Sequence, residues 1–295
     1  MVPISLFIWL LMEIAAYLAF SRYGFGASWG VAMLAALGGI VGLRAGIVAI
    51  TWVYAFSHSS PAPTLSALAR LRMIIGDYLA FLLNFVLVIP FERLWMPADR
   101  LGSCKRPILL VHGYGCSRGI WWRIRRDLEA AGHTVASVSL YPPYTSIGKL
   151  VPQLATRIDE VCAATGAQQV ILIAHSMGGL VCRSYLSRHG ISRVEQLITL
   201  ATPHQGSELA RIGLGQNARE MEPGSKWLRD LAAEPTRVPI TSIRTCHDNY
   251  VMPQDYQRLA GAKDIELPGI GHLAMLYATR TSKLLIACCE GVGKR

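Results

Sequence analysis

The sequence predicts an α/β protein, with a mostly parallel sheet and helices on both of its faces, preceded by about three transmembrane helices. Three observations predict it. Roughly the first hundred residues are apolar and almost free of carboxylates, strand-like and helix-like segments alternate after residue 106, and a serine flanked by small residues stands between one such strand and the following helix. Alternation of strands and helices is typical of a parallel sheet that is covered on both sides.

The composition separates the chain into two regions. Apolar residues make up 52% of the chain and charged residues 16%, whereas an ordinary soluble domain has about 45–50% and about 25%. Between Met1 and Phe91 the only carboxylates are Glu13 and Asp77. We therefore divide the chain into an N-terminal membrane region (1–96), a linker (97–106) and an α/β domain (107–295).

Three apolar stretches, 2–20, 27–56 and 73–91, make up most of the N-terminal region. Each approaches or exceeds the ~20 residues that a helix needs to cross a bilayer. The first five residues contain no basic side chain, which argues against a cleaved signal peptide. We expect three spans, and two alternatives stay open: two spans with an interfacial helix, or a soluble hydrophobic N-terminal domain.

Two features of these stretches suggest how they pack. Gly38, Gly42 and Gly46 repeat every four residues, and small residues at this spacing let two membrane helices approach closely. This face is expected to pack on another span, although membrane helices are also generally rich in glycine. Glu13 and Arg44 are expected to pair, because an isolated charge inside a membrane is costly.

The segments of the α/β domain follow in a regular order. Strand-like runs are found at 107–111, 169–174, 194–201 and 238–246, and helix-like stretches at 120–131, 147–165, 177–188 and 273–289. The second strand-like run leads into Ala174-His175-Ser176-Met177-Gly178-Gly179. A nucleophilic serine at a sharp turn from strand to helix requires small residues two positions away on either side, and Ala174 and Gly178 meet that need. Ser176 is therefore the predicted nucleophile.

A second motif, His112-Gly113-Tyr114-Gly115, directly follows the first strand-like run. Acyl transfer to a serine needs donors for the oxyanion of the tetrahedral intermediate, and two backbone N–H groups usually provide them. We expect these from Met177, which follows the nucleophile, and from Tyr114. An ordinary glycine turn is the alternative interpretation of this motif.

An acid and a histidine should follow the serine in that order. Asp248 follows the strand-like run 238–246, and His272 precedes the last helix-like stretch. In this arrangement His272 accepts the proton of Ser176, and Asp248 fixes the tautomer of the imidazole. The other candidates fit less well by position: His175, His189, His204 and His247 as the base, and Asp255 and Asp264 as the acid.

These segments together resemble the lipase/esterase branch of the α/β-hydrolase superfamily, from Pro107 to about Cys289. The matching segments are 109–115, 174–179, Leu200-Ala201-Thr202-Pro203-His204-Gln205-Gly206-Ser207, His247-Asp248-Asn249-Tyr250-Val251-Met252-Pro253 and Gly271-His272. The resemblance implies an α/β-hydrolase fold and hydrolysis of carboxylic esters. It also implies that 203–237 carries a cap over the acyl pocket, unless this is an ordinary surface excursion. The first hundred residues lie outside the resemblance, and a hydrophobic region fused to such a domain is similar to bacterial membrane-bound hydrolases of unassigned substrate.

The predicted function is therefore a membrane-bound serine hydrolase that cleaves lipid or other apolar acyl esters. No cofactor motif and no calcium or zinc ligand set is found in the sequence, so neither is expected. Two alternatives stay open: an acyltransferase that uses the same triad, and a non-catalytic membrane scaffold or transporter component with a hydrolase-like domain. The oligomeric state is left undetermined.

Charge and cysteine content bear on partners and location. The net charge is +10, but Lys and Arg are scattered and form no nucleic-acid motif, so a basic face beside an anionic membrane is the better interpretation. The seven cysteines show neither metal spacing nor a disulfide framework, which favours a reducing compartment.

The basic residues near the membrane predict the orientation of the chain. With three spans, two of them lie on one side (Arg70, Arg72) and five on the other (Arg22, Arg93, Arg100, Lys105, Arg106). Since basic segments stay cytoplasmic, we expect a bacterial inner-membrane protein whose catalytic domain faces the cytoplasm.

Overall fold

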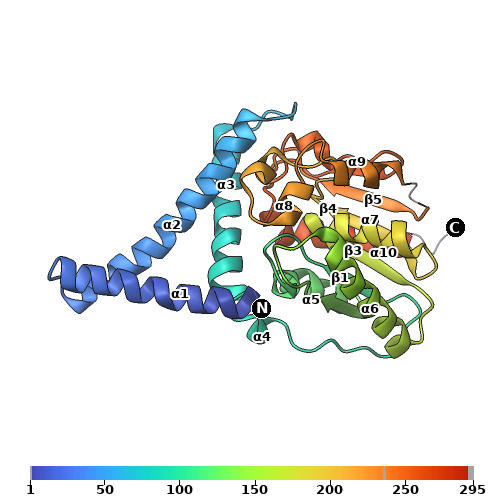
Figure 1. Cartoon of the computed structure of the whole chain (residues 1–295), viewed down its shortest axis with the longest axis horizontal. Coiled ribbons are helices and arrows are strands. Elements are labelled where there is room, and N and C mark those ends of the chain that lie inside the picture. The colour runs from blue at the N-terminus through green and yellow to red at the C-terminus, as the bar shows by residue number, and fades with distance from the viewer. Residues whose placement is uncertain (1, 235–236, 292–295) are drawn as a thin grey trace.

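The α/β domain lies beside three long N-terminal helices, as the computed structural model of the chain shows (Figure 1). The structure describes residues 2–234 and 237–291. The sheet has six strands in the order β2-β1-β3-β4-β5-β6, and all neighbouring strands are parallel. The predicted fold class, a parallel sheet between helices that follows long apolar helices, is therefore confirmed.

Parallel strands covered on both faces are near-continuous apolar runs, and the central strands have this character. The strands are β1 (Ile108–Val111), β2 (Val135–Val138), β3 (Val170–His175), β4 (Val194–Leu200), β5 (Ile240–Arg244) and β6 (Lys263–Glu266). The sequence did not predict β2, because this strand has only four residues and Ser137 interrupts its apolar pattern. It pairs with β1 at the side of the sheet opposite β6.

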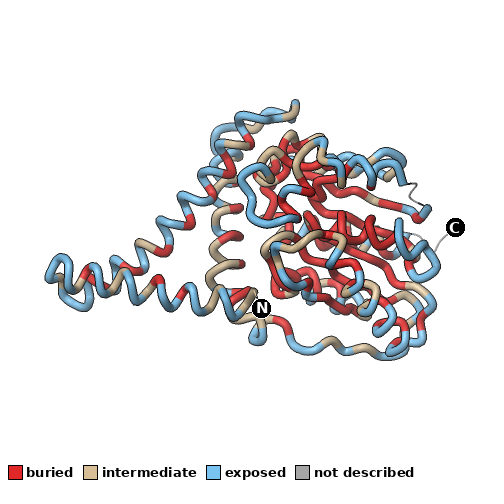
Figure 2. Tube along the Cα trace, viewed as in Figure 1, coloured by how far each residue is buried: buried red, intermediate tan, exposed pale blue. Residues whose placement is uncertain are grey.

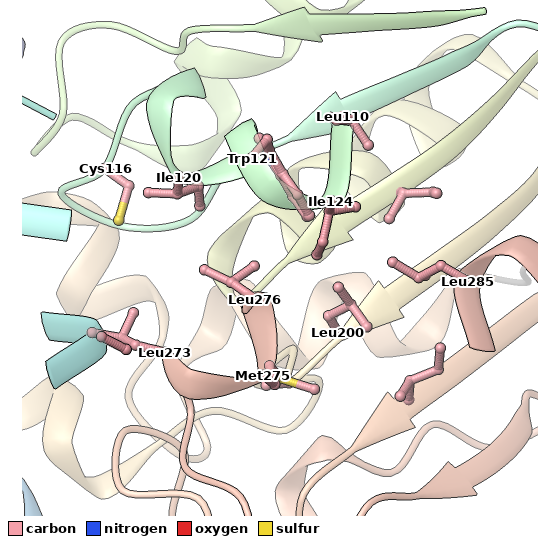
Figure 3. Packing of buried hydrophobic residues seen from close by; sticks show 14 of the residues in the cluster. Leu110, Cys116, Ile120, Trp121, Ile124, Leu200, Leu273, Met275, Leu276 and Leu285 are labelled. Atoms are coloured by element: carbon pink, nitrogen blue, oxygen red, sulfur yellow. The ribbon is translucent and has the colours of Figure 1, made fainter. Parts of the chain in front are cut away.

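Helices pack on both faces of the sheet. They are α5 (Trp122–Ala130), α6 (Ile147–Thr165), α7 (Met177–His189), α8 (Gln216–Glu220), α9 (Lys226–Ala233) and α10 (Thr279–Gly291). Successive side chains of a strand point to opposite faces, so Leu110 of β1 packs with Trp121 and Leu285, whereas Leu109 packs with the α6 and α7 side. Figure 3 shows the first of these two cores. The predicted helix 273–289 is divided into a short 3-10 turn, Ala274–Leu276, and α10.

The N-terminal region forms the three expected apolar helices. They are α1 (Val2–Ala19, continued by a π-helical turn to Gly24), α2 (Trp29–Ser57) and α3 (Ala67–Leu82, continued by a π-helical turn to Val88), and the short α4 (Glu92–Trp95) follows. With 23, 29 and 22 residues, the three are long and apolar enough to cross a membrane. Helix α3 begins before the predicted residue 73 because the Ser66 side chain accepts a hydrogen bond from the Ala69 N–H and caps the helix.

Helices α1 and α2 pack through the expected charge pair and through a face that the glycine pattern did not predict. Arg44 donates a hydrogen bond to Glu13, and both side chains are buried. A Cβ added at Gly38, Gly42 or Gly46 would meet nothing, so the prediction that this face packs on another span is wrong. Arg44 lies two residues from both Gly42 and Gly46, on the other side of α2, and its pairing with Glu13 turns that side toward α1.

Burial differs sharply among the three helices (Figure 2). Helices α1 and α2 are exposed over most of their surface, whereas α3 and its continuation lie along the α/β domain and have the largest buried share of the three. Asp77 and Asn84 of this segment have no exposed surface, and Asn84 accepts a hydrogen bond from the Tyr277 hydroxyl. Helix α3 is therefore packed against the domain that carries the predicted catalytic residues.

Candidate active site

The turn between β3 and α7 places Ser176 at the carboxyl edge of the sheet. Its φ of 55° and ψ of −130° lie in a region that residues other than glycine rarely adopt. The Ser176 N–H donates to the carbonyl of Leu200 in β4 at 2.8 Å, which ties the turn to the sheet. A Cβ at Gly178 would lie 2.5 Å from the Val111 oxygen, so only glycine fits beside this turn. The strained backbone lifts the serine side chain out of the sheet, as a nucleophile requires.

The loop after β1 packs directly on this turn. A Cβ at Gly113 would lie 2.8 Å from the Ser176 Cβ. His112 anchors the loop: its Nε2 accepts from the Leu140 N–H at 2.9 Å, and its protonated Nδ1 donates to the Gly113 carbonyl at 2.9 Å. Burial lowers the pKa of His112 to about 4, so the imidazole is neutral near pH 7. His112 is therefore a structural residue that holds the loop against Ser176.

The two backbone groups predicted for an oxyanion hole flank this contact. Met177 is the first residue of α7, and Tyr114 lines the cavity at Ser176. In the described part of the chain, neither residue's N–H donates to another protein group. The positive end of α7 adds to the affinity of this point for an anion. The Tyr114 hydroxyl donates to the Leu214 carbonyl at 2.6 Å and accepts from the Leu214 N–H at 2.8 Å, so its side chain holds the segment 208–221.

Asp248 follows β5 by four residues and is completely buried. Its Oδ1 accepts from the N–H groups of Tyr250 and Val251 at 2.7 and 2.8 Å, and its Oδ2 accepts from His272 Nδ1 at 2.8 Å. Gln257 donates to the same Oδ2 at 3.3 Å. Since Nδ1 carries the donated proton, Nε2 of His272 is the nitrogen able to accept one.

Two aromatic rings enclose the imidazole of His272. The ring of Tyr250 stacks on it with a centroid distance of 5.0 Å, and the ring of His175 lies at 4.5 Å. Burial, and then the neighbouring His272, hold the pKa of His175 well below its usual value. His175 donates from Nε2 to the His272 carbonyl at 3.2 Å, so this competing histidine has a structural role in the loop.

Ser176 and His272 line one cavity of about 520 Å³, together with Gly113 and Tyr114. The structure thus brings together the five predicted site residues: Ser176, Asp248, His272, Tyr114 and Met177. The competing acids lie elsewhere. Asp264 pairs with Arg244 at 2.9 Å, and Asp255 pairs with Arg258 at 2.8 Å.

Two residues that support the site were not predicted from the sequence. The carboxylate of Asp77, on α3, accepts from the N–H groups of Leu273 and Ala274 at 2.8 and 3.0 Å and from Asn249 Nδ2 at 2.8 Å. Asn249 Oδ1 in turn accepts from the His272 N–H at 3.2 Å. The available signal was an ionisable residue in a membrane-like stretch, which is by default a candidate for function.

Comparison with known proteins agrees with this architecture. Residues 106–223 match the family described as alpha/beta hydrolase fold. The crystal structure of Bacillus licheniformis lipase BlEst2 in its mature form superposes with a TM-score of 0.58 at 22% identity, covering 66% of this chain and 96% of that one. The chain has an α/β-hydrolase fold. The family match covers Tyr114, Ser176 and Met177 of the candidate site.

The chain also matches curated enzymes over part of its length. The triacylglycerol lipases of Pseudarthrobacter phenanthrenivorans and Burkholderia plantarii are each 35% identical to it over 121 residues, which is 38% of this chain. The match spans 38% and 34% of the two relatives, little more than a third of their length.

Replacement of Asp248 by Asn should lower kcat by about 10⁴, because an amide no longer holds His272 in the tautomer that leaves Nε2 free. Asp255→Asn and Asp264→Asn are matched controls, since their carboxylates pair with arginines away from the imidazole. Initial rates on a chromogenic ester, measured at equal amounts of folded protein, compare the three variants. An equal or larger loss in either control would place the acid elsewhere.

Proposed function

We propose that this α/β-hydrolase cleaves carboxylic esters with Ser176 as nucleophile, His272 as general base and Asp248 as the residue that orients the histidine. The observation that carries the proposal is the 2.8 Å bond from His272 Nδ1 to the buried Asp248, with His272 lining the same cavity as Ser176. The triacylglycerol lipase relatives and the intact strand-turn-helix at Ser176 support the same chemistry.

The first half of the reaction forms an acyl-enzyme. Ser176 Oγ attacks the ester carbonyl carbon while His272 Nε2 takes its proton, and the backbone N–H groups of Tyr114 and Met177 stabilise the oxyanion. When the tetrahedral intermediate collapses, the bond from the carbonyl carbon to the alcohol oxygen breaks. His272 then returns the proton to the departing alcohol.

Water completes the cycle. It gives a proton to His272 Nε2 and attacks the acyl carbon. Collapse of the second intermediate breaks the bond from the acyl carbon to Ser176 Oγ, which takes the proton back from His272, and a carboxylic acid is released. The steps require no cofactor or metal ion. Acyl transfer would differ only in the acceptor, an alcohol or amine in place of water.

The substrate class that we propose is a lipid or other apolar acyl ester. The cavity beside Ser176 is lined mainly by apolar side chains, including Leu6, Trp9 and Phe85. An apolar cavity of this kind binds an acyl chain because it removes apolar surface from water. A long-chain ester should therefore be a better substrate than a short one.

We also propose that the region 1–96 anchors the chain in a bacterial inner membrane, with 97–106 as linker and the catalytic domain 107–295 in the cytoplasm. Three helices long and apolar enough to span a bilayer support the anchor. The orientation is supported by the basic residues Arg93, Arg100, Lys105 and Arg106, which lie between α3 and β1.

Ser176→Ala should abolish ester hydrolysis, with a loss on the order of 10⁴–10⁶ in kcat, because the acyl-enzyme cannot form. The measurement is a panel of esters with short and long acyl chains, run on detergent-solubilised protein. The variant should also lose labelling by a fluorophosphonate probe while its thermal unfolding stays close to that of the parent. A variant with half of the parent activity would refute the assignment of the nucleophile, and a parent with no chain-length preference would refute the lipid substrate.

The orientation can be tested with reporters fused separately after Arg295. A cytoplasmic domain gives a fluorescent fusion with green fluorescent protein and an inactive fusion with alkaline phosphatase, because the phosphatase is active only after export. An active phosphatase with a dark fluorescent protein would instead place the catalytic domain outside the cytoplasm.

A further inference from the structure

The cavity beside Ser176 has a wall that the N-terminal helices provide. Val2, Leu6 and Trp9 of α1, and Phe85 from the continuation of α3, line the same 520 Å³ space as Ser176. These side chains are apolar. A segment far from the α/β-hydrolase motifs in sequence thus forms part of the surface that an ester must contact.

A second cavity, of about 300 Å³, is also lined by Ser176. Its walls include Ile47 and Ile50 of α2, and Leu209 and Met221 of the segment that follows β4. Each of the first two N-terminal helices therefore lines one of two cavities that meet at the nucleophile.

The outer surfaces of the same two helices are apolar and exposed. Large exposed side chains include Ile8, Leu11 and Met12 on α1 and Leu34 and Leu37 on α2, all with about half or more of their surface accessible. An apolar surface of this extent on helices of 23 and 29 residues fits the hydrocarbon of a bilayer. The helices that line the cavities on one side thus face lipid on the other.

The helix ends show which helices can cross the bilayer. The ring of Phe7, near the start of α1, lies edge-on to the ring of Phe91, just after α3, with 5.5 Å between centroids. In a series of three spans these residues would be separated by most of a hydrocarbon core about 30 Å thick. Their contact puts the start of α1 and the end of α3 on the same side.

Helix α3 itself is held by the α/β domain. Asp77 accepts hydrogen bonds from Leu273 and Ala274, and Asn84 accepts one from Tyr277 nearly two turns further along. Figure 1 shows α3 lying between the α/β domain and the pair formed by α1 and α2. These polar contacts, in the second half of α3 and in its continuation, fit a helix that covers the domain, not one surrounded by lipid.

We propose that α1 and α2 form a two-span hairpin, that α3 stays with the α/β domain, and that the acyl chain of a membrane lipid reaches Ser176 from the bilayer along α1. The sequence left open two spans with an interfacial helix; here there are two spans, and the third helix packs on the α/β domain. The substrate part of this proposal rests on the proposed ester hydrolysis. The two-span arrangement also increases the difference in the number of basic residues between the two sides of the membrane. Only Arg22 then lies between α1 and α2, whereas six basic residues lie on the side of the α/β domain: Arg70, Arg72, Arg93, Arg100, Lys105 and Arg106.

Protease accessibility of short peptide tags tests the hairpin on the full chain. One tag precedes Met1, one follows Arg295, and a third is inserted at Gly26 between α1 and α2. The hairpin predicts that the two terminal tags are digested together in inverted membrane vesicles, whereas the Gly26 tag is digested only in spheroplasts. Terminal tags digested from opposite sides would overturn the hairpin in favour of three spans, whatever the enzyme hydrolyses.

Variants at Leu6 test the route of the acyl chain. Leu6→Trp fills the cavity and should lower the ratio of kcat/KM for a palmitoyl to a butyryl nitrophenyl ester by about 10-fold or more, since a pocket methylene alone contributes a factor of about 10. Leu6→Ala enlarges the cavity and should raise that ratio. The matched control is Leu11→Trp, on the same helix but 51% exposed, whose ratio should equal that of the parent.

The outcomes separate the two proposals. If the parent hydrolyses no ester, the proposed function is refuted, and the conclusion from the tag digestion is unaffected. If the parent hydrolyses esters but the Leu6 variants have the same palmitoyl-to-butyryl ratio of kcat/KM as Leu11→Trp, only the proposed route along α1 is refuted.

A second inference follows independently from the hydrogen bonds of Asp77. Its carboxylate has no exposed surface and accepts three N–H donors, from Leu273, Ala274 and Asn249. A Cβ at Gly271 would lie 2.5 Å from Asp77 Oδ1, so the residue before His272 must be glycine for the carboxylate to fit.

Asn249 connects Asp77 to the backbone of His272 and to helix α2. Its Oδ1 accepts from the His272 N–H at 3.2 Å, and its Nδ2 also donates to Thr51 of α2 at 2.8 Å. It directly follows Asp248 in the chain. The geometry points to Asp77 as a positioning residue, which sets the backbone of 271–274 and thereby the place of His272 between Asp248 and Ser176.

The test compares Asp77→Ala with Asn84→Ala on the full chain, and rests on the proposed hydrolysis for its readout. Both remove a buried contact between the α3 segment and the domain, but only Asp77 bonds the His272 loop. Asp77→Ala should lower kcat by about 10²-fold, as displacement of a reacting group by about 1 Å does, with KM little changed and fluorophosphonate labelling slowed in parallel. Asn84→Ala should lower the Tm and leave kcat close to that of the parent.

The conservative variant Asp77→Asn retains one acceptor oxygen for the two backbone N–H groups and should recover part of the lost kcat. It also provides the comparison if Asp77→Ala does not fold. Equal losses of kcat in Asp77→Asn and Asn84→Ala, or a parent-like kcat in both Asp77 variants, would reduce Asp77 to a purely structural contact.

Discussion

The buried carboxylate of Asp77 sets a constraint on which much of the structure depends. A carboxylate away from water is tolerated only when its oxygens are hydrogen-bonded, and the donors available here are the backbone of Leu273 and Ala274 and the side chain of Asn249. The α3 helix must therefore dock on the loop that carries His272. The apolar core agrees with this coupling, because Met73 and Phe81 of α3 belong to the same cluster as Leu200 of the sheet. The N-terminal helices and the site are built as one unit.

The second constraint is the parallel sheet, whose strands all end at one edge. The loop of Gly113 follows β1, Ser176 follows β3, and Asp248 follows β5, so three segments distant in sequence meet there. Burial then separates the roles of the histidines that gather at this edge. His112 and His175 are buried, and burial keeps both imidazoles neutral. Each donates a hydrogen bond from one ring nitrogen to a backbone carbonyl. His272 instead donates Nδ1 to a carboxylate and lines the cavity, which is the arrangement of a general base.

The two apolar cavities link this chemistry to the membrane region. Helices α1 and α2 present apolar side chains outward, where a bilayer would contact them, and inward, where Leu6 and Ile50 line space beside Ser176. A lipid ester that must leave a bilayer loses favourable apolar contacts unless the enzyme replaces them. In the proposed function, the cavity walls that α1 and α2 form beside Ser176 provide that replacement. The polar pair of Glu13 and Arg44 holds the two helices together in a region otherwise free of charge.

The sequence alone determined the parallel α/β fold and the apolar helices, and it predicted the residues of the candidate triad. These depend on local patterns: short apolar runs, helical periodicity, and the small residues that the turn at Ser176 requires. It did not reveal β2, whose four residues become a strand only by pairing with β1, or the face on which α2 meets α1, which the partner of Arg44 decides. Only the tertiary structure placed Asp77 beside the loop of His272, almost two hundred residues away. Such a contact leaves no periodic signal, because it depends on how two separate segments dock and on the absence of a side chain at Gly271.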